Sequence, residues 1–188
     1  MDVIDLMLLH QPTGNWKSGW KLLEKGVKEG KIRSIGLSNF PKDKIEELIG
    51  QCEIRQVILQ MELHPYNQEP EFKKWLNEQG ITTQACYPLG HGDRALIEEP
   101  LFTKLAGKYN KSNVQIILRW HVQDGNIIIP GSKNPAHTLS NLEIRDFELT
   151  PEEMADIAAL SQNKHYYTST PELLAKYTST VPDVDHGE

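Results

Sequence analysis

The chain has 188 residues, of which 38% are hydrophobic and 24% are charged, and its formal net charge is −6. This length suffices for one domain with a substantial core, and the acidic balance argues against a nucleic acid or an anionic membrane as partner. No apolar run approaches the ~20 residues of a membrane span, and we expect a cytoplasmic protein.

Strand patterns recur along the chain. The first covers residues 3–9, VIDLMLL, and its near-continuous apolar run is typical of a strand buried on both faces of a parallel sheet. Similar patterns predict further strands at 33–38, 57–63, 81–87 and 126–130.

Helical patterns separate these strands. Ser112 begins one helix, with Gln115 three residues later as a capping box, and the following run is apolar on almost all sides. Thr150, followed by Pro151, begins another helix. The stretch from 88 to 105 is predicted to be an irregular excursion, and residues 162–188 a tail that is mostly loop.

Alternating strands and helices indicate parallel strands joined by helical crossovers. Two architectures fit this pattern: an open doubly wound sheet and part of a (β/α)8 barrel. The open nucleotide-binding sheet normally carries a G-x-G-x-x-G turn after its first strand, whereas this chain has HQPTGNW there. We therefore predict an α/β fold of the (β/α)8 TIM-barrel type, represented by about five βα units.

Polar residues follow each predicted strand. Singly, each has a structural explanation, because a histidine at a strand end is usually hydrogen-bonded and a Ser-Asn pair before a helix is usually a cap. Together they favour a site, since the carboxyl ends of barrel strands meet at one rim. A metal site made of His10, His64 and His91 is disfavoured because no helix carries ligands at a suitable spacing.

The ordered segments IDLMLLHQP, GLSNF, QMELHPYNQ, YPLG, VQIILRW and IIIPGSKNPAHTLSNL give the chain a recognisable pattern. From Val3 to about Leu160 it resembles the aldo-keto reductase superfamily. The resemblance implies a barrel that transfers a hydride from a nicotinamide nucleotide to an aldehyde or ketone. Residues 1–161 would form the C-terminal part of that barrel, about strands four to eight, and 162–188 the tail.

The resemblance also implies roles for particular residues. His10 matches the histidine that lies against the substrate carbonyl, where a neutral imidazole stabilises the developing alkoxide, and Gln11 falls in the substrate pocket. Candidate cofactor contacts are Ser38, Asn39 and Gln60 for the nicotinamide carboxamide, and Ser132, Lys133, His137 and Asn141 toward the adenosine end. Tyr87 and Leu89 are further candidate cofactor contacts.

Two departures from the family pattern affect the cofactor site. Cys86 holds the place of the aromatic residue that stacks under the nicotinamide, so either Tyr87 takes over the stacking or the ring is less well supported. Gly131 and His137 stand where the family often has the Lys and Arg that grip the 2′-phosphate, with Lys133 as a nearby replacement. NADP remains favoured over NAD.

A third departure concerns the acid. The family's Asp, proton-donating Tyr and Lys lie on the first three units, whereas this chain matches from the fourth onward, and none of its tyrosines matches the acid. We expect a truncated reductase of low activity toward a small carbonyl substrate. The alternative is a catalytically silent half-barrel that acts as a binding or assembly module and self-associates through strand edges at 3–9 and 126–130.

Overall fold

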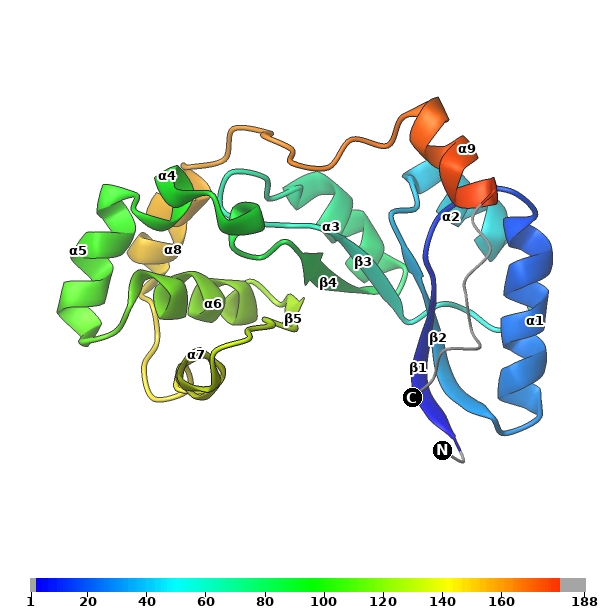
Figure 1. The fold of residues 1–188 in the computed structure, drawn as a ribbon, viewed down its shortest axis with the longest axis horizontal. Helices are drawn as coiled ribbons and strands as arrows, with labels where there is room; N and C mark the ends of the chain where they lie inside the picture. The colour runs from blue at the N-terminus through cyan, green and yellow to red at the C-terminus, as the bar shows by residue number, and fades with distance from the viewer. Residues whose placement is uncertain (1–2, 180–188) are drawn as a thin grey trace. The chain divides into compact units, whose positions relative to one another are not determined.

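The computed structural model describes residues 3–179 of the chain. Contacts divide the chain into two compact units. Unit 1 comprises Met1–Gln56 and Tyr167–Glu188, and unit 2 comprises Val57–Tyr166. Each strand is followed by one or more helices along the chain (Figure 1).

Unit 1 contains two strands. Its elements are β1 (Ile4–Leu9), α1 (Trp16–Lys28), β2 (Ile32–Ser38), α2 (Lys42–Ile49) and α9 (Pro171–Ser179). The strands β1 and β2 pair in parallel, with Leu9 opposite Leu37. Trp20 is buried on α1, which packs against both strands, and Ile45 and Leu48 form the buried apolar face of α2.

Unit 2 contains three strands. Its strands are β3 (Ile58–Glu62), β4 (Thr82–Cys86) and β5 (Ile127–Ile128), in the order β3-β4-β5 and all parallel. Its helices are α3 (Pro70–Glu78), η1 (Gly90–Gly92), α4 (Arg94–Ile97), α5 (Pro100–Tyr109), α6 (Asn113–Gln123), α7 (Pro135–Ser140) and α8 (Pro151–Ala158).

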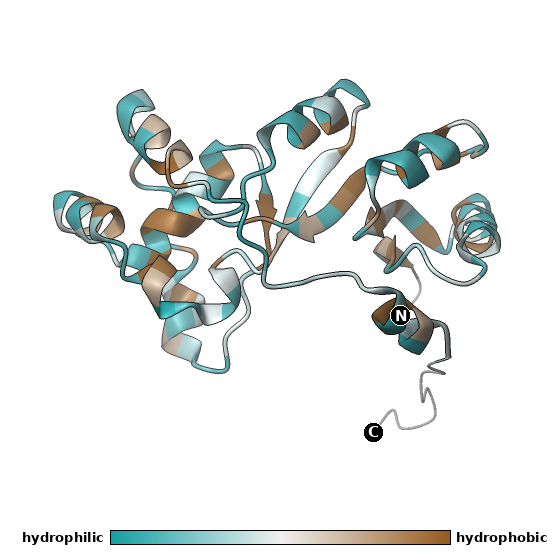
Figure 2. Ribbon diagram, turned by 90° about the horizontal axis from the view of Figure 1, so that it is seen from above, coloured by the Kyte–Doolittle hydropathy of each residue, from teal (hydrophilic) through white to brown (hydrophobic). Residues whose placement is uncertain are grey.

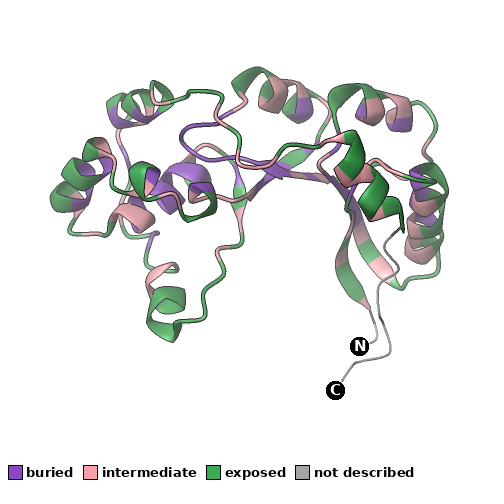
Figure 3. Cartoon of the chain, turned by 45° about the horizontal axis from the view of Figure 1, so that its top comes forward, coloured by how far each residue is buried: buried purple, intermediate pink, exposed green. Residues whose placement is uncertain are grey.

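The largest apolar cluster of unit 2 surrounds α6. Ile116, Ile117 and Trp120 of this helix are buried with Phe102 of α5 and Ile157 of α8. Seven successive residues of α6, from Gln115 to His121, are buried. Most helices mix hydrophilic with hydrophobic residues (Figure 2) and exposed with buried ones (Figure 3). The cluster anchors the helix that lies next to β5 in the sequence.

The expected succession of five strands and intervening helices is confirmed. The capping box of Ser112 and Gln115 is present, because each side chain accepts a hydrogen bond from the other residue's backbone N–H. An equivalent box joins Thr150 to Glu153 at the start of α8. The fifth strand is shorter than predicted and covers only Ile127–Ile128.

The prediction that the first strand is buried on both faces is wrong. Ile4 is 39% exposed and Met7 is 42% exposed, and no residue of β1 is fully buried. In the described part of unit 1, β1 pairs with β2 and packs against α1. These neighbours leave part of the apolar run in contact with solvent.

Two segments predicted to be irregular contain helices. The stretch from 88 to 105 includes α4 and the first part of α5, whose first residue is Pro100, a residue favoured at that position. The tail contains α9, while residues 180–188 lie outside the described part. The backbone N–H of Leu173 donates to Thr170 Oγ1 at 3.2 Å, so Thr170 caps this helix.

Candidate functional site

The parallel pairing of β1 and β2 brings His10 and Ser38 to the same end of the strand pair. Leu9 and Leu37 are opposite each other in the register, and they are followed by His10 and Ser38. Ser38 is 2% exposed, and Asn39 adopts a left-handed conformation with φ 59°. Asn39 Nδ2 donates to Ser38 Oγ at 3.2 Å. The two residues therefore form a fixed polar corner beside the exposed His10.

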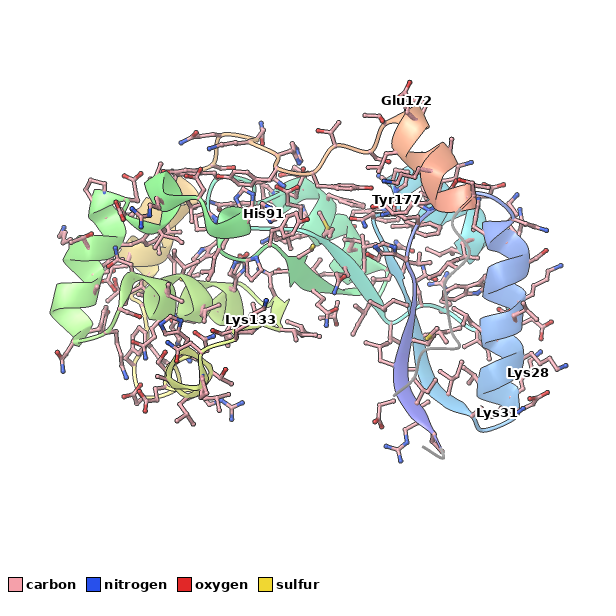
Figure 4. All side chains as sticks on the ribbon, viewed as in Figure 1. Lys28, Lys31, His91, Lys133, Glu172 and Tyr177 are labelled. Atoms are coloured by element: carbon pink, nitrogen blue, oxygen red, sulfur yellow. The ribbon has the colours of Figure 1, made fainter. Side chains whose placement is uncertain are left out.

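An aromatic neighbour of His10 was missed by sequence reasoning. Tyr177 lies on α9 (Figure 4). Its ring meets the imidazole of His10 edge-on, with 5.6 Å between the ring centroids. Thr13 Oγ1 donates to the carbonyl of Leu174 at 3.1 Å and so ties α9 to the loop after β1. The start Thr170-Pro171-Glu172 repeats the residues that begin α8, and this signal could have revealed the helix.

Gln11 is 6% exposed, and neither atom of its amide has a hydrogen-bond partner within the described residues. A buried amide without a partner is costly, by about 1–3 kcal/mol, and is rare in native proteins. Such a group beside His10 suits a site in which a polar atom of a bound molecule completes the hydrogen bonds.

In unit 2, the register of β3 and β4 determines where the next candidates lie. Gln60 is opposite Gln84, and its Nε2 donates to Gln84 Oε1 at 2.6 Å. Tyr87 directly follows β4 in a left-handed conformation with φ 52°, and its ring lies 4.6 Å from that of His91. Tyr87 thus forms part of a strained aromatic corner at the carboxyl end of β4.

Cys86 ends β4 beside this corner. Its thiol is free, and burial, followed by the nearby Glu62 carboxylate, raises the pKa of the thiol. The side chain is therefore a neutral, weakly polar group at neutral pH.

Four predicted residues line one pocket of about 340 Å³, a size within the range of small-molecule sites. Leu89, Ser132, His137 and Asn141 are these four, and Ser112, Val114, Gln115, Gly131 and Ser140 complete the lining. Lys133 is exposed beside Ser132 (Figure 4).

The loop that leads into this pocket is held by its own side chains. Ser132 Oγ accepts from the backbone N–H of Asn134 at 3.0 Å, and Asn134 Oδ1 accepts from that of Ala136 at 3.0 Å. The Asn134 side chain thereby caps α7, the helix that carries His137. Ser132 and His137 are therefore presented by one short, capped turn.

The candidates thus form two sets, one in each unit. His10, Gln11, Ser38 and Asn39 belong to unit 1, and Gln60, Tyr87, Leu89, Ser132, Lys133, His137 and Asn141 belong to unit 2. Among residues 3–179, no group of three or more His, Cys, Asp or Glu side chains is placed to hold a metal ion. Within the same range, none of the helices has the length and apolar character needed to cross a membrane.

Parallel strands, helical crossovers and polar residues after the strands define an α/β protein of the barrel type. The model of the aldo/keto reductase family matches residues 1–162, and the chain belongs to this family. A glyoxal reductase of Bacillus subtilis is 39% identical over 175 residues, which are 93% of this chain and 63% of that relative.

Solved structures agree with this assignment. An aldo/keto reductase from Brucella melitensis has a TM-score of 0.80 and 38% identity, and the match covers 86% of this chain and 62% of the other. A Bombyx mori aldo-keto reductase in complex with NADP has a TM-score of 0.82 and 33% identity, with coverages of 88% and 60%. These neighbours confirm the predicted fold class, and the chain spans about three fifths of their length.

Proposed function

We propose that the chain is part of an NADP(H)-dependent aldo/keto reductase that reduces an aldehyde or ketone to an alcohol. The observation that carries this proposal is the pocket shared by Leu89, Ser132, His137 and Asn141, four residues that the family resemblance assigns to the cofactor. The lining of the pocket includes the hydrogen-bonding side chains of Ser132, His137 and Asn141, which suits an adenosine moiety.

The proposal also states which part of the family's barrel this chain forms. We assign the five units to strands four to eight, with residues 1–161 as the barrel portion and 162–188 as its tail. Five of eight units would occupy roughly the share of the relatives that the chain covers, which is 63% for the glyoxal reductase of Bacillus subtilis. Superposition of β1 on the first strand of a full-length relative, instead of the fourth, would overturn this assignment.

The residues of unit 1 would serve the reacting carbonyl. The nicotinamide supplies the hydride when it is bound. His10 would donate a hydrogen bond to the carbonyl oxygen and stabilise the charge that develops there. Gln11 would complete its amide hydrogen bonds with a polar atom of the substrate, while Ser38 and Asn39 would hold the carboxamide.

The residues of unit 2 would hold the remainder of the cofactor. Gln60 would contact the carboxamide, Tyr87 would stack on the nicotinamide, and Lys133 with His137 would attract the 2′-phosphate. Because Lys133 and His137 stand in place of the usual Lys and Arg, we propose a modest preference for NADP over NAD.

Fluorescence titration with NADPH tests this proposal. His137→Ala should raise the dissociation constant by about 3- to 10-fold, the effect expected when one hydrogen bond or ion pair to the ligand is lost. Thr138→Ala is the matched control, because Thr138 follows on the same helix and lines a different hollow. Equal effects of the two substitutions, or no binding by the unmodified chain, would contradict the cofactor assignment.

A second candidate function is a binding or assembly module that self-associates. It is favoured by the exposed apolar residues on two strands, Ile4 and Met7 of β1 and Ile127 of β5. Apolar edge strands promote pairing with other chains. Sedimentation at several concentrations tests this: a stable monomer throughout would count against it.

A further inference from the structure

A chain of buried hydrogen bonds ends at the turn that carries Tyr87 and Leu89. His121, near the end of α6, is 0% exposed, and its Nε2 lies 3.0 Å from the carbonyl oxygen of Pro88. Because a carbonyl can only accept, Nε2 carries the proton and donates it. The helix is thus bonded directly to the residue between two candidate cofactor contacts.

The other side of the imidazole is also occupied. Asn126 Nδ2 lies 3.4 Å from His121 Nδ1, and Thr83 Oγ1 donates to Asn126 Oδ1 at 2.6 Å. Asn126 Nδ2 also donates to Asp124 Oδ2 at 2.9 Å. Every donor in this series of hydrogen bonds meets an acceptor only if His121 is the neutral Nε2–H tautomer. Burial agrees, since it lowers the pKa of His121 to about 3.

The turn that His121 contacts is strained. Tyr87 has φ 52°, a conformation that residues other than glycine seldom adopt. The backbone N–H of Gly90 closes the turn by donating to the Tyr87 carbonyl at 2.8 Å. Strained backbone persists where the surrounding structure fixes it, and here the bond from His121 to Pro88 fixes the middle of the turn.

We propose that His121 is a positioning residue that holds the turn Tyr87–Gly90 in the conformation that presents Tyr87 and Leu89 to the cofactor. The effect on cofactor binding rests on the proposed function, which assigns Tyr87 and Leu89 to the cofactor. The effect on the conformation of the turn rests only on the contacts of His121. His121 touches neither the substrate nor the cofactor in this account.

Two substitutions separate positioning from simple packing. His121→Phe keeps a ring in the buried site and removes both nitrogens, whereas His121→Gln keeps an amide donor near the place of Nε2. Leu118→Ala is the matched control, since Leu118 is also 0% exposed on α6 and its loss creates a cavity. Thr83→Val removes the hydroxyl that donates to Asn126 Oδ1, at the far end of the series of hydrogen bonds, with little change of side-chain shape.

Amide hydrogen exchange over residues 87–92 is the first readout. We expect His121→Phe to accelerate exchange there by about 10-fold or more relative to α5 and α8, because an unsatisfied carbonyl and a strained turn remain. His121→Gln should restore most of the protection, and Thr83→Val should have a smaller effect in the same direction. Unchanged exchange in His121→Phe would overturn the inference, as would equal exchange in the Phe and Gln variants.

The dissociation constant of NADPH is the second readout. His121→Phe should raise it by about 10-fold, while Leu118→Ala should lower the melting temperature and leave the constant within about 2-fold. If the dissociation constant of NADPH rises in both His121→Phe and Leu118→Ala, in step with the fall in melting temperature, His121 only stabilises the fold. If the unmodified chain binds no NADPH, the proposed function fails, and the exchange comparison still decides whether His121 holds the turn.

Discussion

The two units differ in how firmly they hold their candidate residues. In unit 2, Gln60 is bonded to Gln84, the turn after β4 is bonded to His121, and four candidates line one pocket beside the buried helix α6. In unit 1, His10 is exposed at the end of a half-exposed strand and meets the tail helix α9. The difference indicates that the turn after β4 depends on the core around α6, whereas the position of His10 depends on peripheral contacts.

The strongest way to sharpen this comparison is to damage the core of unit 2. Trp120 is 2% exposed within the cluster around α6. Trp120→Ala should lower the free energy of unfolding by about 3–5 kcal/mol, because it removes a large buried side chain and leaves a cavity. Urea denaturation measures this loss, and a decrease below about 1 kcal/mol would contradict the account of the core.

Acid should also act on unit 2. Burial lowers the pKa of His121 from 6.5 to about 3, and burial lowers the pKa of His64 in the same direction. Between pH 6.5 and about 3, the unfolded chain binds a proton that folded His121 does not, so the free energy of unfolding falls as the pH falls.

The slope from one such group is at most about 1.4 kcal/mol per pH unit. His121→Gln should reduce this slope, as measured by urea denaturation at several pH values. An identical pH dependence in the variant and the unmodified chain would show that His121 is not a neutral buried group.

A smaller loss is expected at the start of α8. Thr150→Ala removes the side chain that accepts from the Glu153 backbone N–H and should cost about 1 kcal/mol. Thr150→Ser keeps the acceptor and is the control. Thermal denaturation that finds the Ala and Ser variants equally stable would show that this cap contributes nothing.

The smallest effect on stability is predicted in unit 1. Thr13→Val removes the donor to Leu174 and should cost about 0.5–1 kcal/mol of helix docking, with little effect on overall unfolding. We expect faster amide exchange in α9 and weaker nuclear Overhauser contacts between His10 and Tyr177. If amide exchange in α9 and the Overhauser contacts between His10 and Tyr177 are both unchanged, α9 is held by other contacts.

Much of this organisation could be predicted from the sequence. Periodicity and caps identified the strands and most helices, since Ser112–Gln115 and Thr150–Glu153 are local signals that the structure confirms. The exposure of β1 could not be predicted, because the apolar run reports what a strand can bury and not which neighbours cover it.

The contacts of the candidate residues were predicted less completely than the fold. Strand ends located His10 and Ser38, but the contact between His10 and Tyr177 joins residues far apart in the sequence. His121 was part of an apolar helical pattern that gave no sign of its bond to Pro88. Such contacts depend on tertiary packing, which local patterns do not contain.

The central proposal is that the residues assigned to the cofactor bind it, whereas no tyrosine of the chain serves as the general acid. A parallel assay of NADPH binding and of NADPH oxidation with a simple aldehyde tests it most directly. We predict saturable binding and negligible oxidation, since loss of a general acid typically costs about 10²- to 10⁴-fold in rate. Oxidation within about 10-fold of a full-length relative, abolished by Tyr177→Phe, would contradict the claim and identify the tyrosine beside His10 as the acid.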